Sequence, residues 1–307
     1  MKRQILHILE KNNRIVSGDT ISAALEISRV SVWKHIRELQ ELDYKIIVTP
    51  KGYQLVGTTG TPFPREFSGR ESKVHYFPEL GSTMDTAREM AGKGCPHFTV
   101  VVAGRQKNGR GRLKREWCSL EGGLYFTLIL RPKIPPIFSA RFIFCASLTL
   151  ANLLNKKFSV QAQVKWPNDI LVRGRKISGM LSEMEAEGDR VTFINIGIGI
   201  NVNNDPTFQA DRAISLREIL KESVSRKELL SMFLDAFENR VKHTNLDHVV
   251  SEWKQYTTML NRKIRIVTRD EVSEGLAKDV DENGTLILEL ADGSVKEIVH
   301  GDCFHLG

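Results

Sequence analysis

A chain of 307 residues is long enough for two or three domains and at least one sizeable core. A content of 41% hydrophobic and 26% charged residues excludes an intrinsically disordered chain, and the net charge of +7 favours an anionic partner without naming it. The cysteines form no CxxC pair and indicate a reducing, cytoplasmic environment; they are Cys95, Cys118, Cys145 and Cys303.

Neither a leader nor a membrane span is expected. Residues 1–14 lack the apolar segment and the small-residue cleavage site of a secretory signal. The longest apolar stretch, residues 137–154, is interrupted by Arg141 and by several hydroxyl and amide side chains. We therefore expect a core helix there, and no membrane as a partner.

The first sixty residues predict helices followed by a hairpin. Ser28 is a good N-cap for a helix in which Val32, Ile36 and Leu39 share one face. A short turn joins this helix to the preceding one, so residues 18–37 predict a helix-turn-helix. Two short strands around the proline-glycine turn at residues 49–52 predict a wing.

The outward face of the second helix allows two interpretations. One is a small packing module with a solvated basic face. The other is DNA binding, with this helix in the major groove and the wing on phosphates. The cations favour DNA, whereas for Trp33 both covering the core and touching a base stay open. The expected DNA contacts are Ser28, Arg29, Ser31, Lys34 and Arg37.

The rest of the chain predicts two further domains. Glycine, proline, serine and threonine are frequent at residues 57–72, which indicates a linker. A capping-box-like Ser82-x-x-Asp85 begins a helix, and two apolar strands follow, both expected to be buried on both faces. Short strands and turns after residue 260 predict a small barrel, in which the HGDCFH segment closes a strand and holds no metal. The expected domains are residues 1–62, 65–258 and 260–307.

A basic, glycine-rich stretch lies between those two apolar strands. Residues 104–117, GRQKNGRGRLKREW, contain six cations. Three interpretations compete: a nucleic-acid arm, a solvated loop, and a cradle for a small anionic ligand. The glycines permit close backbone approach, and arginine offers paired donors to phosphate, but the pattern is not that of a Walker loop.

Two later stretches strengthen the ligand interpretation. Residues 165–169, KWPND, crowd a lysine, an amide and a carboxylate at the start of a strand, with Pro167 fixing the turn; the alternative is an ordinary turn stabilised by the asparagine and the aspartate. Residues 193–203 alternate strictly, with Gly197 and Gly199 on one side of the strand and isoleucines on the other. A bare glycine face indicates a ligand or another backbone lying against it, and tight packing of a helix is the alternative.

Four motifs in order resemble the signature of biotin protein ligases: GRGR at 109–112 followed by Trp117, KWPND at 165–169, KISGMLSE at 176–183 and GIGINVN at 197–203. The resemblance covers essentially the whole chain. It implies an α+β protein with three parts. These are a winged helix-turn-helix like that of the bifunctional ligases that repress the biotin operon, a central mixed α/β domain of the class II aminoacyl-tRNA synthetase-like type, and a C-terminal SH3-like β-barrel.

The resemblance also implies a reaction in two steps. Biotin's carboxylate attacks the α-phosphate of ATP, with Mg²⁺, and gives biotinyl-5′-adenylate and pyrophosphate. A lysine of a biotin carrier domain, such as that of acetyl-CoA carboxylase, then takes the biotinyl group. A homodimer that binds operator DNA with the adenylate as corepressor is implied as well. This chemistry needs positioning and positive charge, and no protein nucleophile or tightly bound metal.

The resemblance implies the following site residues, carried over by position as expectations. The catalytic residues are Arg112, Lys165 and Lys176. The biotin-binding residues are Ser82, Thr83, Gln106, Arg110, Gly111, Arg112, Lys176, Gly197 and Gly199. The ATP-binding residues are Arg112, Arg115, Trp117, Lys165, Asn168 and Asn201. Ser82 has the rival role of a plain helix cap. Two positions depart from the family pattern: Met84 replaces the usual asparagine, and Lys114 stands where a glycine is often found.

Three alternatives remain beside this interpretation. A lipoate-type ligase uses related adenylation chemistry, but the KWPND and GRGRxxxxW motifs argue against it. A transcription regulator could sense a ligand without catalysis, although such a sensor has no need of the charge set Arg112, Lys165 and Lys176. The third alternative keeps the enzyme and loses the repressor, so that the winged helix only orders the active site.

Overall fold

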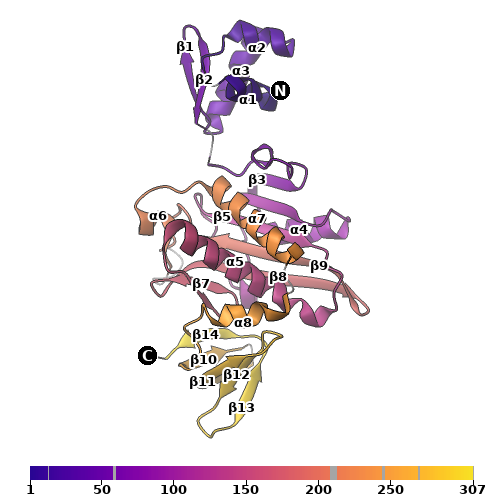
Figure 1. The fold of residues 1–307 in the computed structure, drawn as a ribbon, viewed down its shortest axis with the longest axis vertical. Helices are drawn as coiled ribbons and strands as arrows, with labels where there is room; N and C mark the ends of the chain where they lie inside the picture. The colour runs from indigo at the N-terminus through magenta and orange to yellow at the C-terminus, as the bar shows by residue number, and fades with distance from the viewer. Residues whose placement is uncertain (13, 58–59, 208–212, 244–245, 269, 307) are drawn as a thin grey trace. The chain divides into compact units, whose positions relative to one another are not determined.

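The computed structural model describes residues 1–12, 14–57, 60–207, 213–243, 246–268 and 270–306 (Figure 1). The chain divides into two compact units. The first comprises Met1–Glu71 and Ser225–Glu228, and the second comprises Ser72–Val224 and Leu229–Gly307. Each unit has its own core, so the two are described separately.

The first unit is a helix-turn-helix followed by a hairpin. The hydroxyl groups of Ser17 and Ser28 cap the second and third helices, where they accept hydrogen bonds from the backbone N–H of Thr20 (3.0 Å) and Ser31 (3.1 Å). The buried residues of α3 are the three that the sequence places on one face. The fold of this unit is therefore confirmed. Its elements are α1 (Lys2–Asn12), α2 (Gly18–Leu25), α3 (Arg29–Glu41), β1 (Lys45–Thr49), β2 (Gly52–Gly57) and η1 (Pro64–Glu66).

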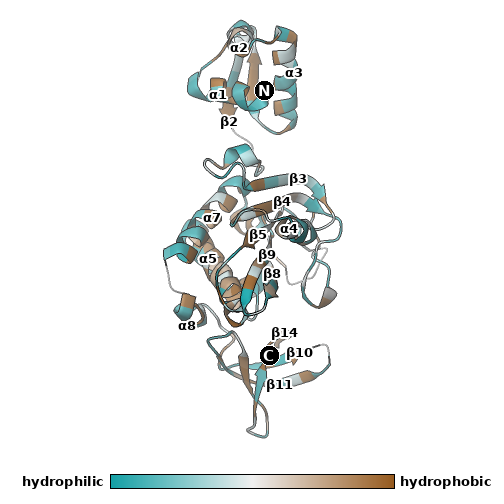
Figure 2. Cartoon of the chain, turned by 90° about the vertical axis from the view of Figure 1, so that its right-hand side faces the viewer, coloured by the Kyte–Doolittle hydropathy of each residue, from teal (hydrophilic) through white to brown (hydrophobic). Residues whose placement is uncertain are grey.

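A seven-stranded mixed sheet forms the centre of the second unit, in the order β3-β4-β5-β9-β8-β7-β6. Only β3 and β4 run parallel; the other neighbours are antiparallel. The middle strands β5 and β9 are largely hydrophobic (Figure 2). The strands are β3 (Val74–Leu80), β4 (Thr99–Gln106), β5 (Leu124–Leu130), β6 (Gln163–Lys165), β7 (Asp169–Val172), β8 (Arg175–Glu187) and β9 (Arg190–Ile200).

Helices cover both faces of this sheet. On one face Thr127 of β5 donates a hydrogen bond to the Thr83 hydroxyl of α4, at 2.9 Å. On the other face its neighbour Phe126 packs edge-on against Phe233 of α7, with ring centroids 5.5 Å apart. The two predicted apolar strands are therefore covered on both faces, as expected. The helices are α4 (Thr83–Gly92), α5 (Ala140–Phe158), α6 (Leu216–Leu220), α7 (Arg226–His243) and α8 (Val249–Lys254), with short η2 (Arg112–Lys114), η3 (Pro136–Phe138) and η4 (Leu246–His248).

Helix α5 is the long apolar segment of the sequence. Within the described ranges, one helical stretch, Pro136–Phe158, is long and apolar enough to cross a membrane by length and composition alone. In the most apolar window of that stretch, 56% of the residues are buried inside the protein. Side chains such as Phe144 and Leu148 lie in the core, so α5 is the core helix that the sequence predicts.

The C-terminal part is an antiparallel sheet in the order β13-β12-β11-β10-β14. Its strands are β10 (Lys263–Val267), β11 (Val272–Val280), β12 (Leu286–Glu289), β13 (Val295–Ile298) and β14 (Asp302–His305). Across the residues that the structure describes, no hydrogen-bonded ladder joins β13 to β14, so closure of the expected barrel is not observed. The α+β class and the three kinds of structure along the chain are confirmed.

Candidate functional site

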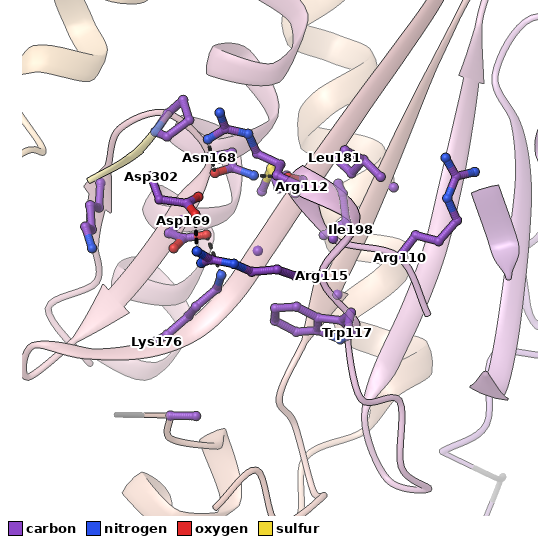
Figure 3. Close-up of a pocket in the computed structure, with 18 of the residues that line it drawn as sticks. Arg110, Arg112, Arg115, Trp117, Asn168, Asp169, Lys176, Leu181, Ile198 and Asp302 are labelled. Atoms are coloured by element: carbon purple, nitrogen blue, oxygen red, sulfur yellow. Dashed lines mark hydrogen bonds and ion pairs between the residues drawn. The ribbon is translucent and has the colours of Figure 1, made fainter. Parts of the chain in front are cut away.

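A pocket of about 420 Å³ opens over the central sheet and reaches the C-terminal sheet. It brings together every residue that the sequence assigns to biotin or ATP. They come from the N-terminus of α4, the end of β4 and the basic loop after it, the β6–β7 turn, β8, and β9 with the residue that follows it. These residues are Ser82, Thr83, Gln106, Arg110, Gly111, Arg112, Arg115, Trp117, Lys165, Asn168, Lys176, Gly197, Gly199 and Asn201. Figure 3 shows the cations Arg112, Arg115 and Lys176 of this pocket.

The glycine face of β9 forms one wall of the pocket, as the alternation predicts. In this structure two side chains lie against it. A Cβ added at Gly197 would be 2.6 Å from Met84 Sδ, and a Cβ added at Gly199 would be 2.5 Å from ring atoms of Trp117. Because Met84 belongs to α4, Gly197 has a helix packed closely against it, which is the alternative interpretation of the glycine face. A ligand that lies on this strand has to share the wall with Met84 and Trp117 or displace them.

The N-terminus of α4 carries a small polar network. Ser82 Oγ accepts a hydrogen bond from the Met84 backbone N–H at 3.2 Å, so Ser82 is a helix cap. The Thr83 backbone N–H donates to Gln106 Oε1 at 2.7 Å, and Gln106 Nε2 donates to Ser119 Oγ at 2.7 Å. Because the amide of Gln106 is fixed at both ends, its orientation toward the pocket is set by the protein.

Arg110 is engaged by acids. Its two terminal nitrogens contact Asp85 Oδ1 and Glu183 Oε1, each at 2.5 Å. Burial lowers the pKa of Arg110, but the carboxylates of Glu183 and Asp85 outweigh that effect and leave the pKa raised. Asp85 thus forms an ion pair with Arg110 of the basic loop. Ser82 caps the helix as expected, but Asp85 does not complete a capping box with it. Figure 3 shows Arg110 turned away from Arg112 and Arg115.

Around the basic loop, the β6–β7 turn and β14, cations and acids of the pocket meet in pairs. Arg112 Nη1 donates to the carbonyl of Gly301 at 3.0 Å, and Arg115 Nη2 lies 2.6 Å from Asp302 Oδ2. Lys176 Nζ lies 2.7 Å from Asp169 Oδ1. Burial lowers the pKa of Arg112, against the opposing influence of Asp302 and Asp169. Arg112 Nη1 also donates to Asn168 Oδ1 at 3.5 Å. This part of the pocket therefore concentrates positive charge whose present partners are a backbone carbonyl, an amide oxygen and two carboxylates.

Aromatic rings border the same cations. Lys176 Nζ is 5.2 Å from the ring centroid of Trp117, and Lys165 Nζ is 5.8 Å from that of Phe304. Within the described part of the chain, the buried Nε1 of Trp117 has no hydrogen-bond partner. A buried donor without a partner is costly, and a pocket wall is where a ligand can satisfy it. Trp117 therefore offers both a ring face and a donor.

The two pocket asparagines tie neighbouring strands together. Asn168 Nδ2 donates to the Met180 carbonyl, and Asn201 Nδ2 donates to the Lys176 carbonyl at 3.5 Å. The sequence places KWPND at the start of a strand, with Pro167 fixing the turn. In the structure this turn joins β6 and β7 into a hairpin, in which Lys165 and Asp169 are opposite residues of the two antiparallel strands. The turn points Lys165, Asn168 and Asp169 at the pocket.

Sequence reasoning missed the contribution of the C-terminal sheet. The HGDCFH segment does form a strand, β14, but Gly301 and Asp302 also contact the basic loop, and Phe304 and His305 line the pocket. The cluster of polar residues in that segment was the available signal. The side chain of Lys114, which departs from the family pattern, lies outside the described residues.

The residues expected to contact DNA lie on α3 of the first unit, except Ser28, which is the N-cap of that helix. The hydroxyls of Ser28 and Ser31 are 3.0 Å apart and serve the helix cap, and Arg29 pairs with Asp19 at 3.3 Å. Lys34 and Arg37 are exposed. Trp33 is 53% exposed, so the interpretation in which it covers the core is wrong.

Comparisons with known proteins agree with this arrangement. Family models match residues 2–54 (HTH domain), 76–201 (Biotin/lipoate A/B protein ligase family) and 259–306 (Biotin protein ligase C terminal domain). The chain is 35% identical to the bifunctional ligase/repressor BirA of Bacillus subtilis over 98% of both chains. It is 27% identical to BirA of Escherichia coli, over 95% of this chain and 93% of that protein.

A solved structure agrees as well. The biotin protein ligase from Aquifex aeolicus in complex with biotin and ATP superposes with a TM-score of 0.63 at 28% identity, over 76% of this chain and 97% of that one. The B. subtilis relative matches along nearly its whole length, including the helix-turn-helix. The chain therefore belongs to the family of bifunctional ligase/repressor proteins named BirA.

Proposed function

We propose that the protein is a biotin protein ligase, acting in the cytoplasm, with ATP as co-substrate. Biotin's carboxylate attacks the α-phosphate of ATP and releases pyrophosphate, and a lysine of a biotin carrier domain then displaces AMP from biotinyl-5′-adenylate. The observation that carries the proposal is the pocket itself, in which a glycine strand and a cluster of cations face one cavity. The names of the relatives support the same reaction.

The cationic part of the pocket fits the triphosphate and the reacting carboxylate. Both are anionic, and adenylation proceeds faster when fixed positive charge faces the phosphate oxygens in the transition state. Arg112, Arg115 and Lys176 supply this charge, since each can exchange its present oxygen partner for a phosphate or carboxylate oxygen. Lys165 lines the same pocket, and Trp117 would stack on adenine or shield it.

Mg²⁺ is part of this proposal because it accompanies ATP in such reactions. The oxygen ligands that Mg²⁺ prefers are available from Asp169 and Asn168 in the hairpin turn. The metal would enter with the nucleotide and neutralise phosphate charge. The lysines and arginines of the pocket would then orient the α-phosphate for in-line attack.

The N-terminus of α4 and the glycine wall of β9 fit biotin. Thr83 and Ser119 fix the amide of Gln106, whose second N–H and second oxygen lone pair can serve a urea-like ring. The glycines of β9 let a flat ring approach the strand. Ser82, Arg110 and Gly111 border the same region. Binding would require Met84 and Trp117 to yield part of the space that they occupy.

The ligase proposal is tested by transfer. The full chain is incubated with biotin, ATP and a purified biotin carrier domain, and the mass of the carrier is measured. We expect one biotinyl group on one lysine, and none when that lysine is replaced by arginine. Lipoyl transfer without biotinyl transfer would instead establish the lipoate-type alternative.

We also propose that the first unit binds operator DNA as part of a homodimer, with biotinyl-adenylate as corepressor. The helix-turn-helix, the exposed cations of α3 and the names of the relatives support this. Binding should weaken steeply with salt, because phosphate contacts release counterions. A footprint that is the same with and without biotin and ATP would contradict the corepressor role. The division into residues 1–62, 65–258 and 260–307 belongs to this proposal.

A further inference from the structure

Helix α3 carries two apolar side chains on its outward face. Val30 is 75% exposed and Trp33 53% exposed, whereas Val32 and Ile36, on the inward face, are fully buried. Residues 30, 33 and 37 are spaced at i, i+3 and i+7, so they lie along one stripe of the helix. We call Val30 and Trp33 the apolar stripe. The core does not use it, and exposed valine and tryptophan on a helix favour a contact with something outside the unit.

Positive charge surrounds the apolar stripe. The Arg37 guanidinium lies over the Trp33 ring, 5.6 Å from its centroid, and Lys34 is exposed beside it. A groove of about 380 Å³ separates α3 from the hairpin, and Lys51 of the hairpin lines it together with both residues of the apolar stripe. Asp19 also lines this groove, where it pairs with Arg29. A cationic rim around an apolar centre is complementary to a polyanion that also presents an apolar group.

The major groove of DNA presents one such group. Among the base edges there, the C5-methyl of thymine is the apolar feature, and apolar side chains contact it. Phosphates alone would engage the cations and leave Val30 and Trp33 facing water. We propose that Val30 and Trp33 read thymine methyl groups, so that the bound sequence carries thymine at the matching positions of each half-site. This inference rests on the proposed DNA-binding function and adds to it the chemistry of base recognition.

The size of the effect follows from the methyl group. Removing one buried methyl costs about 0.8 kcal/mol, which is about a fourfold change in affinity. In a two-fold site each contacted methyl occurs twice, once in each half-site. Replacing that pair of thymines by deoxyuridine should therefore weaken binding about sixteenfold. Contacts between cations and phosphates are unchanged by this replacement, so the dependence of binding on salt should stay the same.

The experiment uses the full chain with biotin and ATP. A preferred duplex is first enriched from a random pool, and each thymine in it is then replaced by deoxyuridine. The same duplexes are measured with the variant Val30→Ala/Trp33→Ala and with the control Val56→Ala, whose side chain is 54% exposed on β2 and does not line the groove. Wild type and control should lose affinity about fourfold per contacted methyl, and the double variant should bind thymine and uracil duplexes alike.

Two results would overturn the inference alone. Wild-type protein could bind the enriched duplex equally well with uracil, or the double variant could lose as much affinity as wild type when the methyls are removed. If the double variant loses self-association while keeping its response to the methyls, the stripe is a protein contact. Failure to enrich any sequence would overturn the proposed DNA function together with this inference. The wild-type comparison holds even if the double variant does not fold.

Discussion

A single methyl group added at position 197 tests whether the glycine face of β9 is the biotin surface. The ideal Cβ at Gly197 would lie 2.6 Å from Met84 Sδ and 3.0 Å from its Cγ. Non-bonded heavy atoms prefer about 3.5–4.0 Å, so Met84 must move by about 1 Å in the variant Gly197→Ala. Methionine is unbranched and flexible, which makes this movement inexpensive.

The stability of the variant should therefore change little. Overpacking a core costs about 1–3 kcal/mol, and the flexible Met84 places this site at the low end. Replacing a glycine within a strand by alanine also raises the free energy of unfolding by about 0.5–1 kcal/mol, because the unfolded chain has less conformational freedom to lose. Biotin is a rigid ring system and cannot yield as Met84 can. An overlap worth about 1–3 kcal/mol would weaken its binding roughly 5- to 150-fold.

The assay is calorimetric titration with biotin, beside urea unfolding. Gly92→Ala at the end of α4 is the control, because a Cβ there meets nothing within 4 Å. The added methyl should also weaken biotin binding in the Met84→Ala background, which excludes an effect of a displaced Met84. If Gly197→Ala binds biotin as tightly as wild type, the glycines accommodate only protein side chains, and the assignment of this wall to biotin is refuted.

Three further predictions concern the cations, their acidic partners and pH. Arg112→Gly should still form biotinyl-adenylate but release it about ten- to a hundredfold faster, since a charge-assisted hydrogen bond contributes about 1.5–3 kcal/mol. A blot for biotin on an irrelevant lysine-rich protein should therefore show stray labelling. Loss of adenylation without stray labelling would instead assign Arg112 to the first chemical step. Asp302→Asn should tighten ATP binding up to about fivefold, because Arg115 then binds a phosphate without first leaving the Asp302 carboxylate. If this variant binds ATP more weakly than the control Asp292→Asn, Asp302 instead holds Arg115 in the position that binds ATP. Burial, with a contribution from Lys73, lowers the pKa of His97 below its usual 6.5, and its Nδ1 accepts a hydrogen bond from the Arg131 backbone N–H at 2.8 Å. As pH falls, the unfolded chain protonates His97 before the folded chain does. The free energy of unfolding should therefore fall as pH drops through 6.5 toward the lower folded pKa. His97→Gln should make the free energy of unfolding, measured by urea titration, depend less on pH in this range.

Local signals predicted much of the fold. The caps at Ser28 and Ser82, the spacing of Val32, Ile36 and Leu39, and the apolar runs of β4 and β5 each act within a few residues, so the sequence alone is enough to read them. The short strands β6 and β7 were harder, because runs of three and four residues carry little periodicity. The sequence predicted the turn at Pro167 and the strand that starts at Asp169, but not the three-residue strand β6 before the turn.

Contacts between distant segments could not be predicted in the same way. The ion pair between Arg115 and Asp302 and the hydrogen bond from Arg112 to Gly301 join residues almost two hundred positions apart. Nothing in either local pattern specifies the other. The glycines of β9 did indicate a close approach to the strand, but which side chains approach, Met84 and Trp117, depends on how α4 and the basic loop pack. Tertiary packing therefore determined the details of the pocket.

Biotin-dependent exchange of pyrophosphate into ATP tests the central claim most directly. This measurement reports reversible formation of the adenylate and requires neither a carrier protein nor DNA. The full chain with Mg²⁺ should catalyse exchange with biotin, and little or none with lipoate or octanoate at the same concentration. Exchange with lipoate or octanoate in preference to biotin, or no exchange with any of the three, would contradict the account.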